Sequence, residues 1–386
     1  MDNGRRHGLD FLRATMMLLG VVLHAAASFI PGEPDASWPY RDPQRNLLFG
    51  IAAVLIHMFR MPAFYVLAGF FVAQSIDAKG ASRVLRDRTT RILLPLTIGW
   101  VLLFPLVKGA FVFGVAQMAN AKPEDALSLA IRTATQWTEP HPMHLWFLWY
   151  LWLFVASYIA MKYLAARLMP TSVSHRWNQL VNGVIRLERP FVPSPLLVVA
   201  TFLVILHMKM PGIDTPGSFI PDMGIFACYF VFFWLGTRLH VLREILPELQ
   251  NTAGRRLWRA AFFMLIYIIA CIVWFDGLTK TGSAPYGAFI VAQAALSLAI
   301  WPLILGGAGL AERWISREIA PIRYLSDSAY WVYLMHLPLC IGIAVLLRHA
   351  PYSALTKCGI TIGATITVCL LTYEAARRVI PAGAKH

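Results

Sequence analysis

The feature that most limits the fold of this chain is a series of long apolar segments along its 386 residues. A membrane-spanning helix needs about 20 mainly apolar residues to cross a hydrocarbon core about 30 Å thick. Ten segments approach this length. Their expected extents are 9–30, 47–76, 92–117, 144–167, 194–211, 222–240, 258–276, 285–311, 325–348 and 355–377. We therefore predict an all-α polytopic membrane helix bundle of about ten helices, forming a single integral membrane domain over residues 1–386.

The composition supports a membrane protein and excludes several other classes. Hydrophobic residues make up 58% of the chain and charged residues 14%, whereas a soluble domain carries roughly 25% charged residues. The sequence has no Walker motif, no Rossmann glycine fingerprint and no HExxH pair. We therefore expect no metal and no permanently bound cofactor. The five cysteines lack metal-ligand spacing, and we interpret them as small core residues.

The distribution of basic residues predicts the orientation in the membrane. Lys and Arg exceed Asp and Glu by 34 to 20, and most of them follow every second apolar segment, as in 79–91 and 238–259. Cytoplasmic loops carry such an excess, so both termini are expected in the cytoplasm. This topology, together with contact with anionic lipid, explains the net charge of +14 without a nucleic-acid partner.

The first apolar segment, "LDFLRATMMLLGVVLHAAASF", carries a polar stripe. Arg13 and His24 are 11 residues apart, so on a helix they lie within roughly 20° of one face and about 16 Å apart. Asp10 can pair with Arg13 at a spacing of three residues. Ionisable groups in membrane helices are costly and usually functional. Arg13 suits an anion such as phosphate or an interfacial anchor. His24 suits a general base, a metal ligand, a proton relay or a packing histidine.

The second apolar segment contains "HMFRMPAFYVLAGFF". His57 and Arg60 share a helix face there, and Arg60 lies near the middle of the membrane, the most expensive place for a cation. Arg60 either binds an anionic ligand or pairs with a buried acid, for which Asp10 and Glu374 are the main candidates. Glu374 can also pair with an arginine at the cytoplasmic end of the last helix.

Two further segments carry candidate side chains. In "HPMHLWFLWYLWLF", His144 is expected at the outer mouth, and Trp146 begins a run of tryptophans typical of an interfacial aromatic belt. In "SDSAYWVYLMHLPL", Ser326 suits the start of a helix, while Tyr333 and His336 lie deeper. Together with the stripe, these residues indicate a polar path in which a long anionic molecule presents its reactive end near His24.

At these residues the chain resembles the acyltransferase-3 membrane family. "LDFLRATMMLLGVVLH" resembles the family's Arg-x10-His signature. "FRMPAFYVLAGFF", "RTTRILLP", "HLWFLWYL" and "YWVYLMHLPL" resemble its motifs in the second, third, fourth and ninth helices. The motifs occur in the expected order and extend to "TYE" near the C-terminal end. The resemblance therefore covers essentially the whole chain and implies a membrane acyltransferase.

Within this family, the chain resembles the glucan biosynthesis protein C branch, which adds succinyl groups to osmoregulated periplasmic glucans. The shared features are a His-x-x-Arg-Met in the second helix, here at His57, Arg60 and Met61, and a ninth-helix His followed by Pro-Leu. The family often has Ser-Gly where this chain has Ala68 and Gly69, so a hydroxyl group is missing here. The branch implies an O-succinyltransferase of the bacterial inner membrane.

The resemblance implies a role for each candidate residue. Succinyl-CoA or another acyl-CoA would act as the donor on the cytoplasmic side, and a glucan would act as the acceptor on the periplasmic side. The expected catalytic residues are His24, Arg13 and Asp10. The expected CoA-binding residues are Arg13, Arg88 and Arg91. The expected substrate-binding residues are Arg60, His57, His144, His336, Trp146, Tyr333 and Glu374. Whether His24 acts as a general base or as a nucleophile forming an acyl-histidine remains open.

Two alternative functions remain open at this point. One is the same chemistry with another acyl group or acceptor, such as O-acetylation of a different cell-envelope polysaccharide. The other is transport of an organic anion or a proton-coupled solute, since intramembrane His and Arg also suit a transporter. Inverted repeats with broken helices would favour transport, and the sequence shows none convincing. The sequence leaves both a monomer and a homo-oligomer open.

Overall fold

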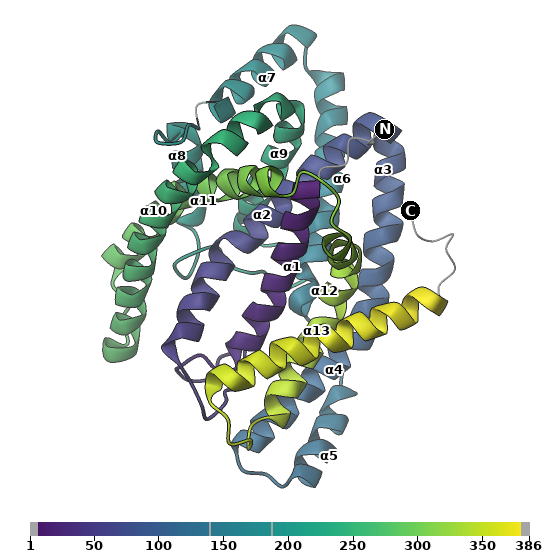
Figure 1. The fold of residues 1–386 in the computed structure, drawn as a ribbon, viewed down its shortest axis with the longest axis vertical. Coiled ribbons are helices and arrows are strands. Elements are labelled where there is room, and N and C mark those ends of the chain that lie inside the picture. Colours follow the sequence, from purple (N-terminus) through teal and green to yellow (C-terminus); the bar gives the residue numbers. More distant parts are fainter. Residues whose placement is uncertain (1–6, 139, 187, 380–386) are drawn as a thin grey trace. The chain divides into compact units, whose positions relative to one another are not determined.

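The computed structural model describes residues 7–138, 140–186 and 188–379, and these residues form helices, turns and loops without a strand (Figure 1). The α-helices are α1 (His7–Ala27), α2 (Leu47–Lys79), α3 (Ala81–Arg88), α4 (Leu94–Met118), α5 (Pro123–Ala134), α6 (Trp146–Leu168), α7 (Thr171–Arg186), α8 (Pro195–Ile205), α9 (Met223–Val241), α10 (Leu246–Thr281), α11 (Tyr286–Trp314), α12 (Ala320–Leu346) and α13 (Ala354–Val379). Shorter turns are η1 (Thr89–Leu93), η2 (Met143–Leu145) and η3 (Arg243–Ile245). The predicted all-α class is confirmed.

Most of the expected membrane spans are present. Within the described residues, nine helical stretches are long and apolar enough to cross a membrane. The prediction of a spanning helix over 194–211 is wrong, because α8 has only 11 residues and is about 16 Å long, roughly half the hydrocarbon thickness. Both chain ends, expected in the cytoplasm, lie outside the described residues, so their location stays a prediction.

An irregular segment, residues 206–222, follows α8 and is held by buried side chains. Gln293 of α11, which is fully buried, donates to the carbonyl of Gly212 at 3.2 Å and accepts from its N–H at 3.0 Å. His57 donates through Nε2 to the carbonyl of Ile213 at 3.1 Å. His57 lies ten residues into α2, about 15 Å from its start. Non-helical backbone at such depth is tolerated where protein groups satisfy it, as here.

Proline shapes several of the spanning helices. Pro105 and Pro302 lie inside α4 and α11. Immediately before Pro95 the chain forms a π-helical turn, η1. Proline has no N–H and its ring crowds the carbonyl four residues earlier, here that of Arg91, so a wider turn relieves the strain.

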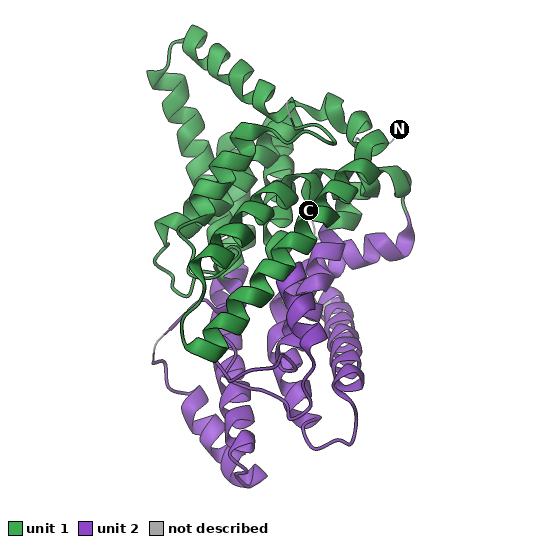
Figure 2. Ribbon diagram, turned by 90° about the vertical axis from the view of Figure 1, so that its left-hand side faces the viewer, with its two compact units in different colours: residues 1–12, 57–94, 146–318 green, residues 13–56, 95–145, 319–386 purple. Residues whose placement is uncertain are grey.

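The described chain divides into two compact units, each made of three separate stretches (Figure 2). Unit 1 comprises Met1–Leu12, His57–Leu94 and Trp146–Glu318, and unit 2 comprises Arg13–Ile56, Pro95–Leu145 and Ile319–His386. In unit 1, α10 packs along α11, and in unit 2, α12 packs along α13.

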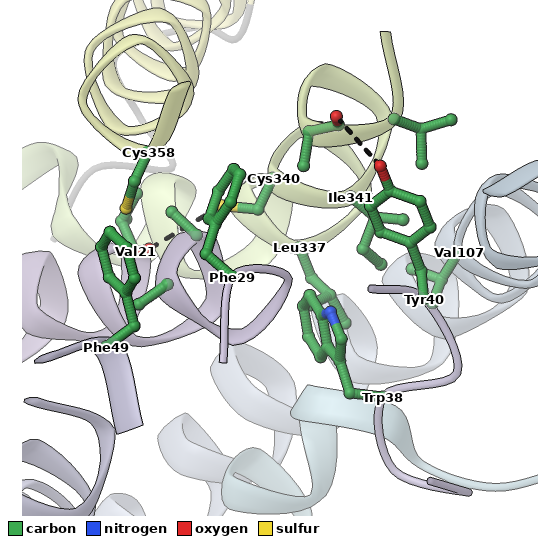
Figure 3. Close-up of a cluster of buried hydrophobic side chains, with 14 of the residues drawn as sticks. Val21, Phe29, Trp38, Tyr40, Phe49, Val107, Leu337, Cys340, Ile341 and Cys358 are labelled. Carbon is green, nitrogen blue, oxygen red and sulfur yellow. Dashed lines mark hydrogen bonds between the residues drawn. The ribbon is translucent and has the colours of Figure 1, made fainter. Parts of the chain in front are cut away.

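The core of unit 2 contains side chains from a loop as well as from helices. The 28–46 loop, which connects α1 to α2, inserts Trp38 and Tyr40 among buried residues that include Leu337 and Ile341 of α12 (Figure 3). The Tyr40 hydroxyl donates to a backbone carbonyl of α12 at 3.4 Å. The loop is therefore part of the core of unit 2.

A buried ion pair fixes the far end of the same loop. The Nζ atom of Lys357, in α13, lies 3.2 Å from Oδ1 of Asp42, and both side chains are essentially inaccessible to solvent. Burying two charges is costly unless the pair is well bonded. Asp42 also accepts a hydrogen bond from the backbone N–H of Gln44, and Lys357 donates to the carbonyl of Arg348. These bonds hold the loop against α13.

Candidate functional site

His24 lies in the last turn of α1 and is partly exposed. Two aromatic rings of unit 2 enclose it. The indole of Trp38 stacks on the imidazole with a centroid distance of 5.8 Å and an interplanar angle of 16°. The ring of His336 approaches it with a centroid distance of 5.1 Å and a tilt of 44°. His24 is therefore positioned by its neighbours while part of its surface stays accessible.

Two more predicted residues join this group. The ring of His144, in η2, lies 5.1 Å from that of His336, measured between centroids, and 5.5 Å from that of Tyr333. The Tyr333 hydroxyl donates to the backbone carbonyl of His144 at 2.5 Å, and His144 Nε2 donates to the carbonyl of Leu334 at 3.1 Å. These two bonds connect η2 to α12. We call His24, His144 and His336 the histidine cluster.

Trp38 is a site residue that the sequence did not reveal. It is 7% exposed, and its Nε1 donates to the Ser28 hydroxyl at 3.1 Å. Its indole also meets the ring of Phe111 edge-on at 5.1 Å. Helical periodicity cannot place a residue that lies in a loop. The one feature of the sequence that could have indicated Trp38 is its position only 14 residues after His24.

Arg41 and Asp35 stabilise the part of the loop that carries Trp38. The Arg41 guanidinium donates to the carbonyl of Trp38 and to the Asp35 carboxylate, both at 2.9 Å. Burial tends to raise the pKa of Asp35. Hydrogen bonds from the Ser37 side chain and from the N–H groups of Trp38 and Ser37, with the charge of Arg41, outweigh burial and lower that pKa below its usual value.

Arg13 is held at the opposite end of α1 from His24. Its Nη2 donates to the Ser326 hydroxyl at 2.7 Å. The prediction that Ser326 begins a helix is wrong, since α12 begins at Ala320 and Ser326 lies inside it. Asp10, which belongs to unit 1, is 9% exposed in the first turn of α1.

A second group of predicted residues lies in unit 1. His57 uses Nε2 to hold the backbone of Ile213, and Arg60 lies one turn further along α2. The ring of Trp146 lies 5.5 Å from that of Tyr229. Trp146 is 7% exposed, so its predicted place in a lipid-facing aromatic belt is wrong. It packs in a protein core of aromatic rings.

Three further predicted residues lie on α3, η1 and α13. Arg88 ends α3, and Arg91 is exposed in η1. Glu374 accepts from Arg377 at 2.9 Å near the end of α13, which confirms the expected pairing with a nearby arginine. Their predicted roles in binding CoA and substrate stay predictions.

The chemistry available at the histidine cluster is proton transfer or nucleophilic attack by imidazole. A neutral imidazole presents one N–H donor and one lone pair. Among the described residues, no group of three or more His, Cys, Asp or Glu side chains is placed to hold a metal ion. The five cysteines are free and buried, as expected for small core residues, so they are poor candidates for a nucleophile.

Comparison with known proteins assigns the family. Residues 6–374 match the acyltransferase-3 family model, described as an acyltransferase domain. No curated protein and no solved structure matches the chain. The match extends over nearly the whole sequence, from the start of the first apolar segment to Glu374. The chain, a multi-pass membrane protein, therefore belongs to the acyltransferase-3 family.

Proposed function

We propose that the protein transfers a succinyl group from cytoplasmic succinyl-CoA to hydroxyl groups of osmoregulated periplasmic glucans, across the bacterial inner membrane. The observation that carries the proposal is the placement of His24. In an acyltransferase chain, a partly exposed imidazole is stacked on Trp38 and flanked by the buried ring of His336. This arrangement suits an activated group that must reach a substrate.

In the proposed reaction, His24 removes a proton from a glucan hydroxyl while the hydroxyl oxygen attacks the thioester carbonyl. The carbon–sulfur bond then breaks, and the CoA thiolate leaves and takes up a proton. His144 and Tyr333, beside the cluster, would line the acceptor side. Attack by His24 itself, giving an acyl-histidine that the glucan resolves, uses the same residues.

The donor would be bound by cations. Arg13, oriented by Asp10, is proposed to bind CoA phosphates, and the same role is proposed for Arg88 and Arg91, because guanidinium groups bind phosphate in a bidentate manner. Arg60 would pair with the free carboxylate of the succinyl group, since an anion in a medium of low dielectric constant needs a cation.

The other unit 1 residues would have indirect roles in binding the substrate. His57 would support Arg60 by fixing the irregular segment 206–222, and Trp146 would form an apolar wall beside Tyr229. Glu374, which belongs to unit 2, would instead contact substrate groups directly, at the cytoplasmic end of α13.

The direct test is acyl transfer by the purified, detergent-solubilised protein. Radiolabelled succinyl-CoA or acetyl-CoA would be supplied with a periplasmic glucan to the wild type, to a His24→Ala variant and to a His207→Ala control. His207 follows α8, is exposed, and is bonded to the carbonyl of Leu203 in that helix, so its loss should leave activity intact. We expect label to move from succinyl-CoA to the glucan in the wild type and control and not in His24→Ala.

Each alternative function predicts a different result. If label is transferred from acetyl-CoA and not from succinyl-CoA, the protein is an acyltransferase but succinyl-CoA is not its donor. Transfer to a different envelope polysaccharide would reject the glucan acceptor. If no acyl-CoA binds at all, while a solute crosses vesicles containing the His24→Ala variant, transport of an organic anion would replace the proposal.

A further inference from the structure

Helix α7, in unit 1, is connected at both ends to surfaces that face lipid. It begins three residues after the spanning stretch Met143–Leu168 ends, and α8 follows it along the chain (Figure 1). Apolar side chains are exposed at the end of α6, at Leu164 and Leu168, and at the start of α8, at Leu196 and Val199. Apolar surface of this kind on membrane helices contacts lipid tails. Helix α7 therefore lies at the boundary between membrane and water.

One face of α7 packs against the end of α9. Arg238, in the last turn of α9, donates to the side-chain oxygen of Asn178 at 3.0 Å and to that of Asn182 at 2.7 Å. Val181 and Ile185 are buried on the same face, since these four positions of α7 are spaced three or four residues apart. The end of α9 is also the end of a spanning stretch, so this contact holds α7 beside a second membrane helix.

A different face of α7 carries exposed apolar side chains. Val173, Trp177 and Leu180 are 47%, 56% and 57% exposed, and Val184, which is partly exposed, continues the row. We call these four residues the α7 stripe. Their spacing places them within about 60° of one another and about 120° from the face that packs on α9. Exposed apolar patches on folded proteins mark interaction surfaces, so the α7 stripe requires a partner.

The charges around the α7 stripe are of one sign. Arg176 precedes Trp177 and is exposed, and Arg167 is exposed near the end of α6. An anionic lipid surface complements these cations, and tryptophan is typical of the membrane–water interface. An acidic protein could also match the charges, but lipid already adjoins the helices on both sides of α7. From residue 162 to residue 186 the sequence has no Asp or Glu and four basic residues, Lys162, Arg167, Arg176 and Arg186.

We propose that α7 is an interfacial helix whose α7 stripe enters the lipid and whose arginines bind the phosphates of anionic headgroups. The basic segments predict that this leaflet is the cytoplasmic one. Such a helix lies in the membrane plane, with its apolar face about 5–10 Å into the boundary between headgroups and acyl chains. Because α7 is fixed to the ends of α6 and α9, it would set the depth of both in the leaflet. This inference is independent of the proposed acyl transfer.

The test uses nitroxide labels on the full-length protein in nanodiscs of phosphatidylcholine and phosphatidylglycerol that hold one copy each. The native cysteines are buried, so an introduced cysteine takes the label. Leu180→Cys places the label in the α7 stripe. Gln179→Cys is the matched control, at an exposed polar position about 100° around the helix. Power-saturation EPR measures how readily each label meets oxygen, which concentrates among acyl chains, and a neutral nickel chelate, which stays in water.

The two labels should behave in opposite ways. We expect oxygen to reach the label at position 180 and the chelate to be excluded from it, whereas the chelate should reach the label at position 179. If the chelate reaches both labels equally, the α7 stripe faces water and the proposal is overturned. Shielding of position 180 from both reagents would also overturn it, because protein would then cover the α7 stripe. The same holds if shielding from oxygen appears in discs that hold two copies, since a second copy would then displace the lipid.

Discs of phosphatidylcholine alone test the choice of anionic lipid. One arginine near an anionic leaflet should favour the inserted helix about fivefold. We therefore expect the chelate to reach the label at position 180 more readily in the neutral discs, and Arg176→Gln to reduce this difference between the two lipids. Equal accessibility in neutral and anionic discs would overturn the assignment of anionic lipid as the partner.

Discussion

At the scale of single residues, the proposed acyl transfer depends on how the ring of His24 is held. Trp38→Ala removes both the stack on His24 and the hydrogen bond to Ser28, whereas Trp38→Phe retains an aromatic ring without the N–H. We expect kcat to fall about 10–100-fold in Trp38→Ala because the base is misplaced, and to change by less than about threefold in Trp38→Phe. Steady-state acyl-transfer rates measure this, and equal activity of Trp38→Ala and the wild type would exclude a role for the stack.

A substitution of Arg60 tests whether the acyl donor is succinyl-CoA. Arg60→Met keeps the length of the side chain and removes its charge. A charge-assisted hydrogen bond contributes about 1.5–3 kcal/mol, so kcat/KM for succinyl-CoA should fall about 10–150-fold while kcat/KM for acetyl-CoA changes little. An equal loss with both donors would mean that Arg60 supports the fold or CoA itself and does not recognise the succinyl carboxylate.

Most of these residues could be predicted individually from the sequence. The contacts between them could not. Polar side chains stand out in apolar segments because they are costly in a membrane, which is why His24, His144 and His336 were predicted separately. Their proximity depends on the packing of α1, η2 and α12, which lie far apart along the chain. Trp38 was missed because an aromatic residue in a loop carries no such cost.

At the scale of elements, the close approach of α2 and α9 explains why the second-helix motif contains Gly69. A Cβ atom on Gly69 of α2 would overlap the carbonyl oxygen of Phe233 of α9, and one on Gly236 would overlap that of Val66. Small residues let membrane helices approach in this way. Gly69→Ala should therefore destabilise the protein by about 1–3 kcal/mol.

Gly50 provides the matched control for this prediction. It lies in the same helix, and the nearest atom to an added Cβ is 3.7 Å away. Gly50→Ala should be neutral or stabilising by up to about 1 kcal/mol. Thermal unfolding in detergent compares the two variants, and equal melting temperatures would show that the α2–α9 contact is looser than described.

The 28–46 loop should be sensitive to acid. The folded-state pKa of Asp35 is lowered, so its contribution to stability is present above the ordinary value of 3.8 and is lost as the pH falls through the folded pKa. Asp35 is half exposed, and its ion pair with Arg41 should contribute no more than about 1 kcal/mol. We expect Asp35→Asn to melt slightly below the wild type at pH 7, with no difference below the folded pKa. A difference that persists in acid would point to a different cause.

The helices themselves were largely predictable, because the length of an apolar run indicates whether a helix can span the membrane. The segment 194–211 shows the limit of that reasoning. Its apolar content is compatible with a span, but the backbone leaves the helix after Ile205 because Gln293 and His57 supply hydrogen bonds to the irregular segment that follows. Such side-chain support depends on tertiary packing.

At the scale of the whole molecule, the orientation in the membrane can be tested with single cysteines. The native cysteines are buried and should react slowly. Segment 206–222 lies beside the start of α6, since Trp149 donates to the carbonyl of Phe219 at 2.8 Å, and that end of α6 is expected on the periplasmic side. In intact cells, we expect a membrane-impermeant maleimide to label Ser218→Cys and to label Ser82→Cys only after permeabilisation. Labelling of both from one side would contradict the topology.

Acyl transfer across the membrane through His24 can be measured in sealed proteoliposomes. Glucan would be enclosed in the lumen and labelled acyl-CoA supplied outside, so that only chains with their cytoplasmic face outward can use the donor. We predict label on the lumenal glucan with the wild type and His207→Ala, and none with His24→Ala. Label that appears only when donor and glucan share one compartment, or that persists in His24→Ala, would contradict the account.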